Sequence, residues 1–173
     1  MTTKELFLKE KIREGDEIFF VGLFTPHIGQ QKNYPITRFG RIALLTDEKI
    51  AWKDLSGERL MDLYLAECQS YGGNSGSPVF FYLEATRNPG ILAGPPKFLL
   101  AGIMQGYFND AQKVEFIQTQ ATPISLQNMG IAAIVPAYKL YEILFSEKLT
   151  NVRAKKIAEL SSAAVSPPVS ETV

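Results

Sequence analysis

The segment best suited to chemistry in this chain of 173 residues is Gly72-Gly73-Asn74-Ser75-Gly76-Ser77-Pro78. An acyl-transfer nucleophile needs an exposed hydroxyl with unobstructed main-chain N–H groups nearby to hold the developing oxyanion. Glycine at position 73 permits backbone angles closed to other residues, so the N–H groups of Gly73 and Ser75 could converge on one point. The segment therefore indicates a nucleophilic serine. A plain turn between two strands is the alternative, because Gly, Asn and Ser are common turn formers.

Two other serine and glycine motifs do not fit this segment. The G-x-S-x-G elbow of α/β hydrolases requires Gly where the chain has Ser77, and it requires a helix to follow, whereas Pro78 and Val79 begin an apolar run typical of a strand. A phosphate-binding loop would require the motif G-x-x-x-x-G-K-[ST], the start of a helix and a nearby lysine. The segment around residues 72–78 has none of these three features. The segment is therefore not assigned to either class.

The rest of the composition excludes several classes of function. His27 and Cys68 are the only histidine and the only cysteine, so the sequence predicts neither a disulfide within the chain nor a metal site, and it calls for no cofactor. Eighteen basic and eighteen acidic residues give a net charge of zero, which argues against a nucleic-acid or membrane-surface partner. Seven of the first fourteen residues are charged, so no signal peptide is expected. If Met1 is the true start, the protein is expected in the cytoplasm, whereas the location of a fragment is not predicted.

Short apolar runs separated by Gly, Pro and Asn predict an all-β fold with a six-stranded antiparallel sheet or barrel. Six strands are expected at residues 18–24, 36–45, 63–68, 78–83, 98–107 and 131–135. Pro136 fits a first helical turn, and apolar residues at helical spacing predict a C-terminal helix over 137–148. Residues 149–160 are expected to form a weaker helical extension, and residues 161–173, which lack large apolar groups, a disordered tail.

At the Ser75 segment the chain resembles the trypsin-like (chymotrypsin-fold) serine peptidases, particularly the glutamyl-endopeptidase and HtrA-like branches, which surround the nucleophile with G-N-S-G-S-P or G-N-S-G-G-P. Residues 15–22, Gly-Asp-Glu-Ile-Phe-Phe-Val-Gly, resemble a "G-D-x-V-x-x-x-G" strand of that family, and residues 38–42 resemble its next strand. Residues 101–103 and 128–136 resemble the strand after the nucleophile and the strand that leads into the terminal helix. The matches occur in the family's order and cover about residues 15 to 148, which implies the C-terminal barrel of a double-barrel peptidase as one domain, 1–148.

The resemblance implies roles for particular residues. Ser75 would be the nucleophile, and the amides of Gly73 and Ser75 would form the oxyanion hole. The substrate-binding residues would be Gln69, Ser70, Tyr71 and Gly72 on one wall of the S1 pocket, Gln105, Gly106 and Tyr107 along the substrate main chain, and Gly130, Ile131 and Ala132 on the other wall. No Asp or Arg stands at Gln69, the expected pocket base, so a preference for basic side chains is not supported.

The catalytic His and Asp of this family come from an N-terminal barrel, and only 74 residues precede Ser75. The chain is therefore expected to be the nucleophile-bearing half of a peptidase, with the other barrel supplied by upstream sequence or by another chain. His27 is the one histidine that could act as a base within the chain, but its place in a loop does not require this role, and an exposed loop histidine is the plain interpretation.

Three functions follow from these observations. The first is a serine endopeptidase domain that acts on peptide or protein substrates through Ser75 and is inactive as an isolated chain. The second is a catalytically silent barrel that binds an extended peptide along Gln105–Tyr107. The third is a small-ester hydrolase that uses Ser75 and His27. Cys68, at the end of an apolar run, is interpreted as a buried small hydrophobe rather than a reactive thiol.

Overall fold

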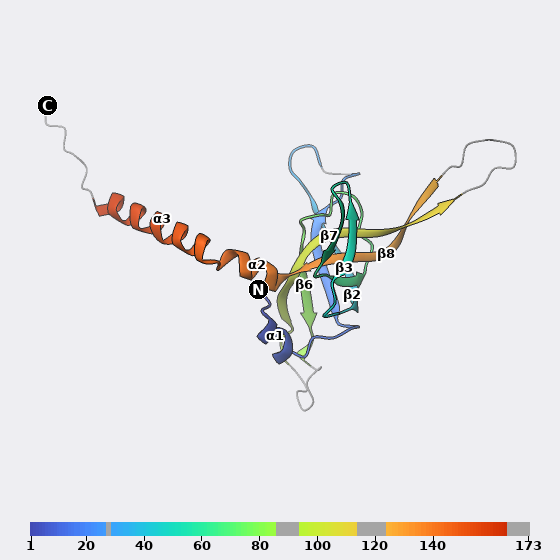
Figure 1. The fold of residues 1–173 in the computed structure, drawn as a ribbon, viewed down its shortest axis with the longest axis horizontal. Coiled ribbons are helices and arrows are strands. Elements are labelled where there is room, and N and C mark those ends of the chain that lie inside the picture. The colour runs from blue at the N-terminus through green and yellow to red at the C-terminus, as the bar shows by residue number, and fades with distance from the viewer. Residues whose placement is uncertain (27–28, 86–93, 114–123, 166–173) are drawn as a thin grey trace. The chain divides into compact units, whose positions relative to one another are not determined.

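The computed structural model describes residues 1–26, 29–85, 94–113 and 124–165 (Figure 1). The chain divides into two compact units, residues 1–138 and 139–173. His27, the candidate base, and residues 166–173 of the predicted tail lie outside the described residues.

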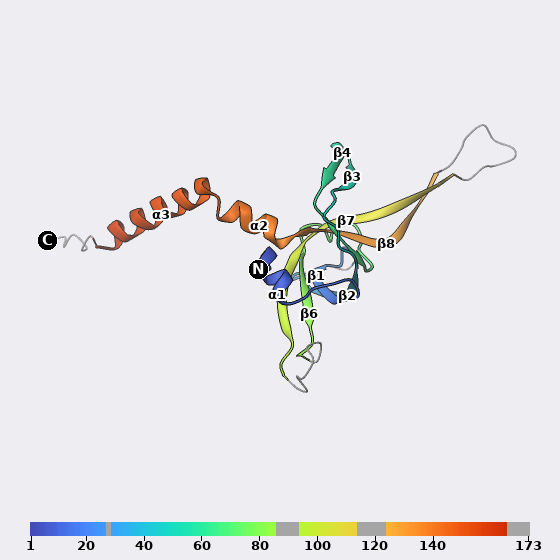
Figure 2. The ribbon, with the colours of Figure 1, turned by 60° about the horizontal axis from the view of Figure 1, so that its bottom comes forward.

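The first unit is a closed antiparallel barrel of six strands in the order β1-β2-β5-β8-β7-β6 (Figures 1 and 2). The strands are β1 (Glu17–Leu23), β2 (Pro35–Leu44), β5 (Tyr64–Glu67), β6 (Pro78–Leu83), β7 (Lys97–Lys113) and β8 (Ile124–Pro136). Each predicted strand is present, so the prediction of an all-β, six-stranded antiparallel barrel followed by a helix is confirmed. β7 and β8 are longer than predicted, because they pair with each other as far as Lys113 and Ile124.

The barrel closes around side chains that alternate along each strand. Ile18 and Phe20 of β1 and Val79 and Phe81 of β6 point inward, and each is at most 1% exposed. The residues between them, including Phe19, point outward, as the two-residue period of a strand requires. Register is fixed strongly in such a sheet, because a slip of one residue would turn the buried aromatic rings out to solvent.

Two elements at the barrel were not predicted. Helix α1 (Lys4–Lys9) is capped by the Thr3 hydroxyl, which accepts from the Leu6 amide at 3.3 Å. Its Phe7 ring packs against Phe81 in the core, with the ring centroids 6.2 Å apart. A helix of six residues is too short to show a helical period in the sequence, which is why the apolar pattern did not reveal it.

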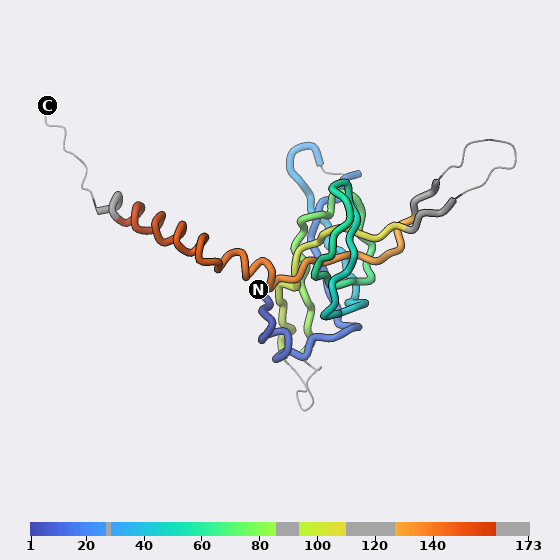
Figure 3. Tube along the Cα trace, viewed as in Figure 1, coloured from blue at the N-terminus to red at the C-terminus, as the bar shows by residue number. Residues whose placement is uncertain are grey.

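The second unpredicted element is a hairpin of β3 (Ile50–Asp54) and β4 (Gly57–Met61), which forms a separate two-stranded sheet. Figure 3 shows it beside β7. Trp52 is its one fully packed side chain, and it forms a small cluster with Leu63 and Ala133 on the outer side of the barrel wall. A hairpin with one buried residue has little apolar alternation, so its sequence resembles that of a polar loop.

The C-terminal helix is interrupted. Helix α2 (Ala137–Leu144) ends before Ser146, whose hydroxyl donates to the Ile143 carbonyl at 2.8 Å, and helix α3 (Glu147–Val165) begins directly after it. The predicted helix over 137–148 is therefore two helices, and the predicted weak extension is part of α3. Residues 161–165 belong to α3, so the prediction of a disordered tail is wrong for these five residues. Serine, alanine and valine continued a helix that had already been nucleated, although they carry little apolar surface.

Candidate functional site

The Ser75 segment is a tight bend between β5 and β6 that depends on two glycines. Gly73 and Gly76 have φ angles of 95° and 86°, which L side chains rarely adopt. The Asn74 amide donates to the Tyr71 carbonyl at 3.1 Å, and the Ser77 amide donates to the Asn74 carbonyl at 3.1 Å. A side chain at Gly73 would also collide with the methyl group of Thr25. The glycines at positions 73 and 76 therefore determine the backbone conformation of the bend.

Asn74 anchors the bend to the barrel. Its side chain is 1% exposed, and its amide, in the orientation that satisfies both neighbours, donates to the Leu23 carbonyl at 3.1 Å and accepts from the Tyr71 amide at 3.0 Å. One side chain thus ties the end of β1 to the start of the bend. The sequence suggested only a turn former at this position, because the partners of Asn74 are set by the tertiary fold.

Ser75 is exposed, and its hydroxyl donates to the main-chain carbonyl of Gln105 in β7 at 3.1 Å. The pairing of β7 with β8 shifts between Met104 and Gly106, so the bulge lies at Gln105. Hydrogen bonds from the Gly76 amide to the Met104 carbonyl (2.8 Å) and from the Met104 amide to the Ser77 carbonyl (2.9 Å) fix the two segments together. Among the described residues, no carboxylate or imidazole accepts the Ser75 proton.

Three main-chain amides of the bend have no hydrogen-bond partner among the described residues. They are the N–H groups of Gly72, Gly73 and Ser75, whereas those of Asn74, Gly76 and Ser77 are bonded. Unpaired N–H groups that converge near a nucleophilic hydroxyl can stabilise an oxyanion as it forms. The amides of Gly73 and Ser75, to which the sequence resemblance gives that role, therefore have no competing partner among the described residues, and the role itself stays a prediction.

The three predicted substrate-binding segments, the two pocket walls and the strand that would pair with the substrate main chain, are linked by hydrogen bonds. The Cys68 amide, next to Gln69, donates to the Gly130 carbonyl at 3.0 Å. The Asn128 side chain donates to the Ser70 carbonyl at 2.6 Å, so the segment from 69 to 72 is held against β8. The bond between Ser75 and Gln105 joins the bend to β7. Residues 69–72 thus lie against β8, and residues 105–107 lie against both β8 and the Ser75 bend.

The residues of these segments differ in how much of each side chain is exposed to a ligand. Gln69 and Tyr71 are exposed, and the Tyr71 hydroxyl donates to the Gln69 side chain at 3.3 Å. Ser70 is fully buried. Ala132 is buried in the core and pairs with Tyr107, so it can offer a ligand only its main chain. Asn128 binds the Ser70 carbonyl. The sequence analysis placed Asn128 in the strand that resembles the last strand of the family, but it assigned this residue no function.

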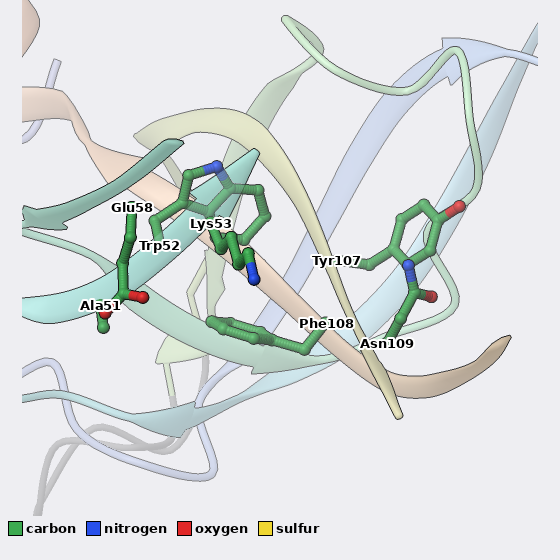
Figure 4. Close-up of a pocket in the computed structure, with 7 residues that line it drawn as sticks. All are labelled: Ala51, Trp52, Lys53, Glu58, Tyr107, Phe108 and Asn109. Atoms are coloured by element: carbon green, nitrogen blue, oxygen red, sulfur yellow. The ribbon is translucent and has the colours of Figure 1, made fainter. Parts of the chain in front are cut away.

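A recess lies just beyond the predicted substrate strand (Figure 4). It has a volume of about 390 Å³, and Trp52 and Phe108 form part of its wall with their rings edge-to-face at 5.3 Å. The Tyr107 side chain points to the side of β7 away from Trp52 and Phe108, as Figure 4 shows. The full lining is Ala51, Trp52, Lys53, Glu58, Tyr107, Phe108 and Asn109. The unpredicted hairpin therefore extends the surface next to residues 105–107.

Cys68 is 6% exposed, and burial raises the pKa of its thiol to about 11, against an opposing effect of the Arg38 charge. We expect Cys68 in the folded protein to react with DTNB at pH 8 at least roughly 100-fold more slowly than in urea-unfolded protein, because thiolate is the reactive form. The neutral thiol stabilises the fold below about pH 9, and this contribution is lost as the pH rises through 11. Fast labelling of the folded protein would contradict the burial of this thiol.

The described residues hold no group of three or more His, Cys, Asp or Glu side chains that could bind a metal ion. In the same part of the chain, no helix is both long enough and apolar enough to cross a bilayer. Comparison with known proteins finds no matching family model, curated protein or solved structure. The function is therefore inferred from the geometry of the Ser75 bend and from the sequence resemblance.

Proposed function

We propose that this barrel is the nucleophile-bearing half of a serine endopeptidase, which hydrolyses peptide bonds when a second barrel supplies His and Asp. One observation carries the proposal: Ser75 is exposed on a bend in which the amides of Gly73 and Ser75 have no hydrogen-bond partner among the described residues. The contact between the Ser75 hydroxyl and the Gln105 carbonyl supports the requirement for a second barrel. A main-chain carbonyl is too weak a base to activate a serine.

In the proposed reaction the substrate lies in an extended form along β7 at Gln105–Tyr107. The Ser75 oxygen forms a bond to the scissile carbonyl carbon, and the hydroxyl proton passes to the histidine of the second barrel. The carbonyl oxygen becomes an oxyanion that accepts from the amides of Gly73 and Ser75. The C–N bond then breaks, the amine leaves with the proton from the histidine, and water hydrolyses the acyl-enzyme in the reverse sequence of proton transfers.

The outer wall of the barrel offers a surface for the second barrel. Phe19 stacks on Phe80 at 5.3 Å and contacts the rings of Phe39 and Phe98 at 6.3 and 5.9 Å. Phe39 is 75% exposed and Phe98 is 56% exposed. This aromatic ladder crosses strands β2, β1, β6 and β7, and β6 begins three residues after Ser75. A contiguous exposed apolar patch of this kind is typical of an interaction surface.

The open edge of β7 favours a second candidate, a silent peptide-binding barrel. β6 pairs with β7 only up to Ile103, while β8 covers the other edge of β7. From Gln105 to Asn109 the β6 side of β7 therefore has no strand partner among the described elements. A peptide could add to this edge by main-chain hydrogen bonds without any chemistry at Ser75. The ester hydrolase that pairs Ser75 with His27 stays a prediction.

The reaction of the chain with a peptide boronate distinguishes the two proposed functions, the peptidase half and the silent peptide-binding barrel. Boron accepts the Ser75 oxygen, the hydroxyl proton goes to solvent, and the resulting anionic adduct mimics the tetrahedral intermediate, so no histidine is needed. We expect an acetyl-tripeptide ending in alanine boronate to give a tetrahedral ¹¹B NMR signal with the unmodified chain. The signal should be absent in Ser75→Ala and retained in Ser56→Ala, which removes an exposed serine of the β3–β4 turn. Peptide binding without a tetrahedral signal would instead support the silent module.

The same proteins provide a test of the missing base. The isolated chain should not cleave casein, and its labelling by a fluorophosphonate should be no faster than that of Ser75→Ala, because the hydroxyl lacks a proton acceptor. Vigorous labelling of Ser75 would overturn the requirement for a second barrel. If that labelling were lost in His27→Ala, the ester hydrolase would replace the peptidase half as the function.

A further inference from the structure

A recess opens beside helix α1 and shares no lining residue with the Ser75 bend or the predicted substrate-binding segments. It has a volume of about 510 Å³, which is within the range of small-molecule sites. Phe7 of α1, Ile12 and Leu45 form its apolar wall, and all three pack on the barrel core. The recess therefore has the size and the apolar wall of a site for a small organic molecule.

One polar group in this recess has no partner. Tyr64 lines the recess and is 9% exposed, and its ring packs against Phe7 with the centroids 5.6 Å apart. Its hydroxyl makes no hydrogen bond with any described residue. Burial raises the pKa of this hydroxyl, and the nearby Tyr138 raises it further, so the hydroxyl keeps its proton at neutral pH. Buried hydroxyls without a partner are rare, so Tyr64 indicates a ligand with a hydrogen-bond acceptor.

The recess also carries both signs of charge. The Lys4 ammonium lies over the Tyr138 ring, 4.8 Å from its centre, while Asp47 and Asp62 add carboxylates to the lining. The buried Thr2 hydroxyl donates to a carbonyl of β7 at 2.6 Å and so anchors the chain just before Lys4. Neither Lys4 nor Asp47 forms an ion pair with a described residue. Opposite charges that line one recess without pairing leave room for a ligand that carries both.

We propose that this recess binds a free α-amino acid with a large apolar side chain. The ligand carboxylate accepts from Lys4 and from the Tyr64 hydroxyl, the ligand ammonium donates to Asp47, and the apolar side chain packs on Phe7 and Leu45. An apolar anion would be repelled by the aspartates, and an apolar amine would be repelled by Lys4, so a ligand with both charges fits best. The site goes beyond the proposed function and does not depend on it.

Four compounds test the site by ¹H–¹⁵N NMR titration of the unmodified chain. They are L-phenylalanine, L-phenylalaninamide without the carboxylate, N-acetyl-L-phenylalanine without the ammonium, and L-alanine without the large apolar group. We expect L-phenylalanine to bind at least about tenfold more tightly than each of the others, because each lacks one complementary group. Equal affinity for L-phenylalanine and any one of them would overturn the amino-acid assignment. The absence of saturable shifts at the Leu45 and Tyr64 amides would overturn the site itself.

Matched variants locate the contacts. Tyr64→Phe removes only the unpartnered hydroxyl, so it should weaken L-phenylalanine binding severalfold and leave the urea midpoint unchanged or higher. Lys4→Met should abolish the preference for L-phenylalanine over its amide, whereas Lys9→Met, which removes an exposed lysine of the same helix, should retain it. Asp47→Asn should reduce the preference over N-acetyl-L-phenylalanine severalfold, and Glu48→Gln at the neighbouring exposed position should not. A preference or an affinity that survives its substitution would overturn the role of that residue.

Discussion

Asn74→Ala is expected to lower the free energy of unfolding by about 2–4 kcal/mol and to abolish the boronate adduct. The side chain is 1% exposed, and its loss would leave the Leu23 carbonyl and the Tyr71 amide without partners. The bend would then lose its link to β1, and the amides of Gly73 and Ser75 would no longer be held beside the hydroxyl. The stability loss is measured by urea unfolding and the adduct by ¹¹B NMR.

Two further variants make the Asn74 result specific. Asn74→Asp keeps the shape of the side chain, but its carboxylate cannot donate to the Leu23 carbonyl, so it should also destabilise the fold. Asn33→Ala removes an exposed asparagine and should change the unfolding free energy by less than about 0.5 kcal/mol. A loss below about 1 kcal/mol in Asn74→Ala would show that the bend does not depend on this side chain.

Phe81→Ala is expected to destabilise the barrel by about 3–5 kcal/mol. Phe81 is fully buried at the centre of β6, where its ring meets Phe7 of α1 inside the closed sheet. Removing the ring leaves a cavity that a closed barrel cannot collapse to fill, because six strands hold the wall in place. Urea unfolding followed by tryptophan fluorescence of Trp52 measures the loss.

The exposed Phe98 provides the matched control for Phe81. Phe98→Ala removes the same ring from the outer face of β7, where it is 56% exposed, and should cost less than about 1 kcal/mol. Should Phe81→Ala leave too little folded protein to measure, Phe81→Leu should still fold, with a loss of about 1–1.5 kcal/mol. Similar losses at positions 81 and 98 would contradict a closed barrel with Phe81 inside it.

The two strands that the sequence predicted most accurately, β1 and β6, alternate buried and exposed residues. Each buries every second residue, and both were predicted to within one residue of their ends. The β3–β4 hairpin and α1 lack this alternation. Trp52 is the one buried residue of the hairpin, and none of the residues of α1 is fully buried. A short element with at most one buried residue leaves too few apolar positions for a periodic pattern to be detected.

The candidate site divides in the same way. The sequence by itself determined the Ser75 bend, because the positive φ angles at Gly73 and Gly76 are a local demand that only glycine meets well. Only the tertiary structure decided which groups meet that bend, namely the Leu23 carbonyl on Asn74 and the Gln105 carbonyl on Ser75. These partners are 30 to 51 residues distant along the chain, and barrel closure and strand register, not local residue preference, bring them together.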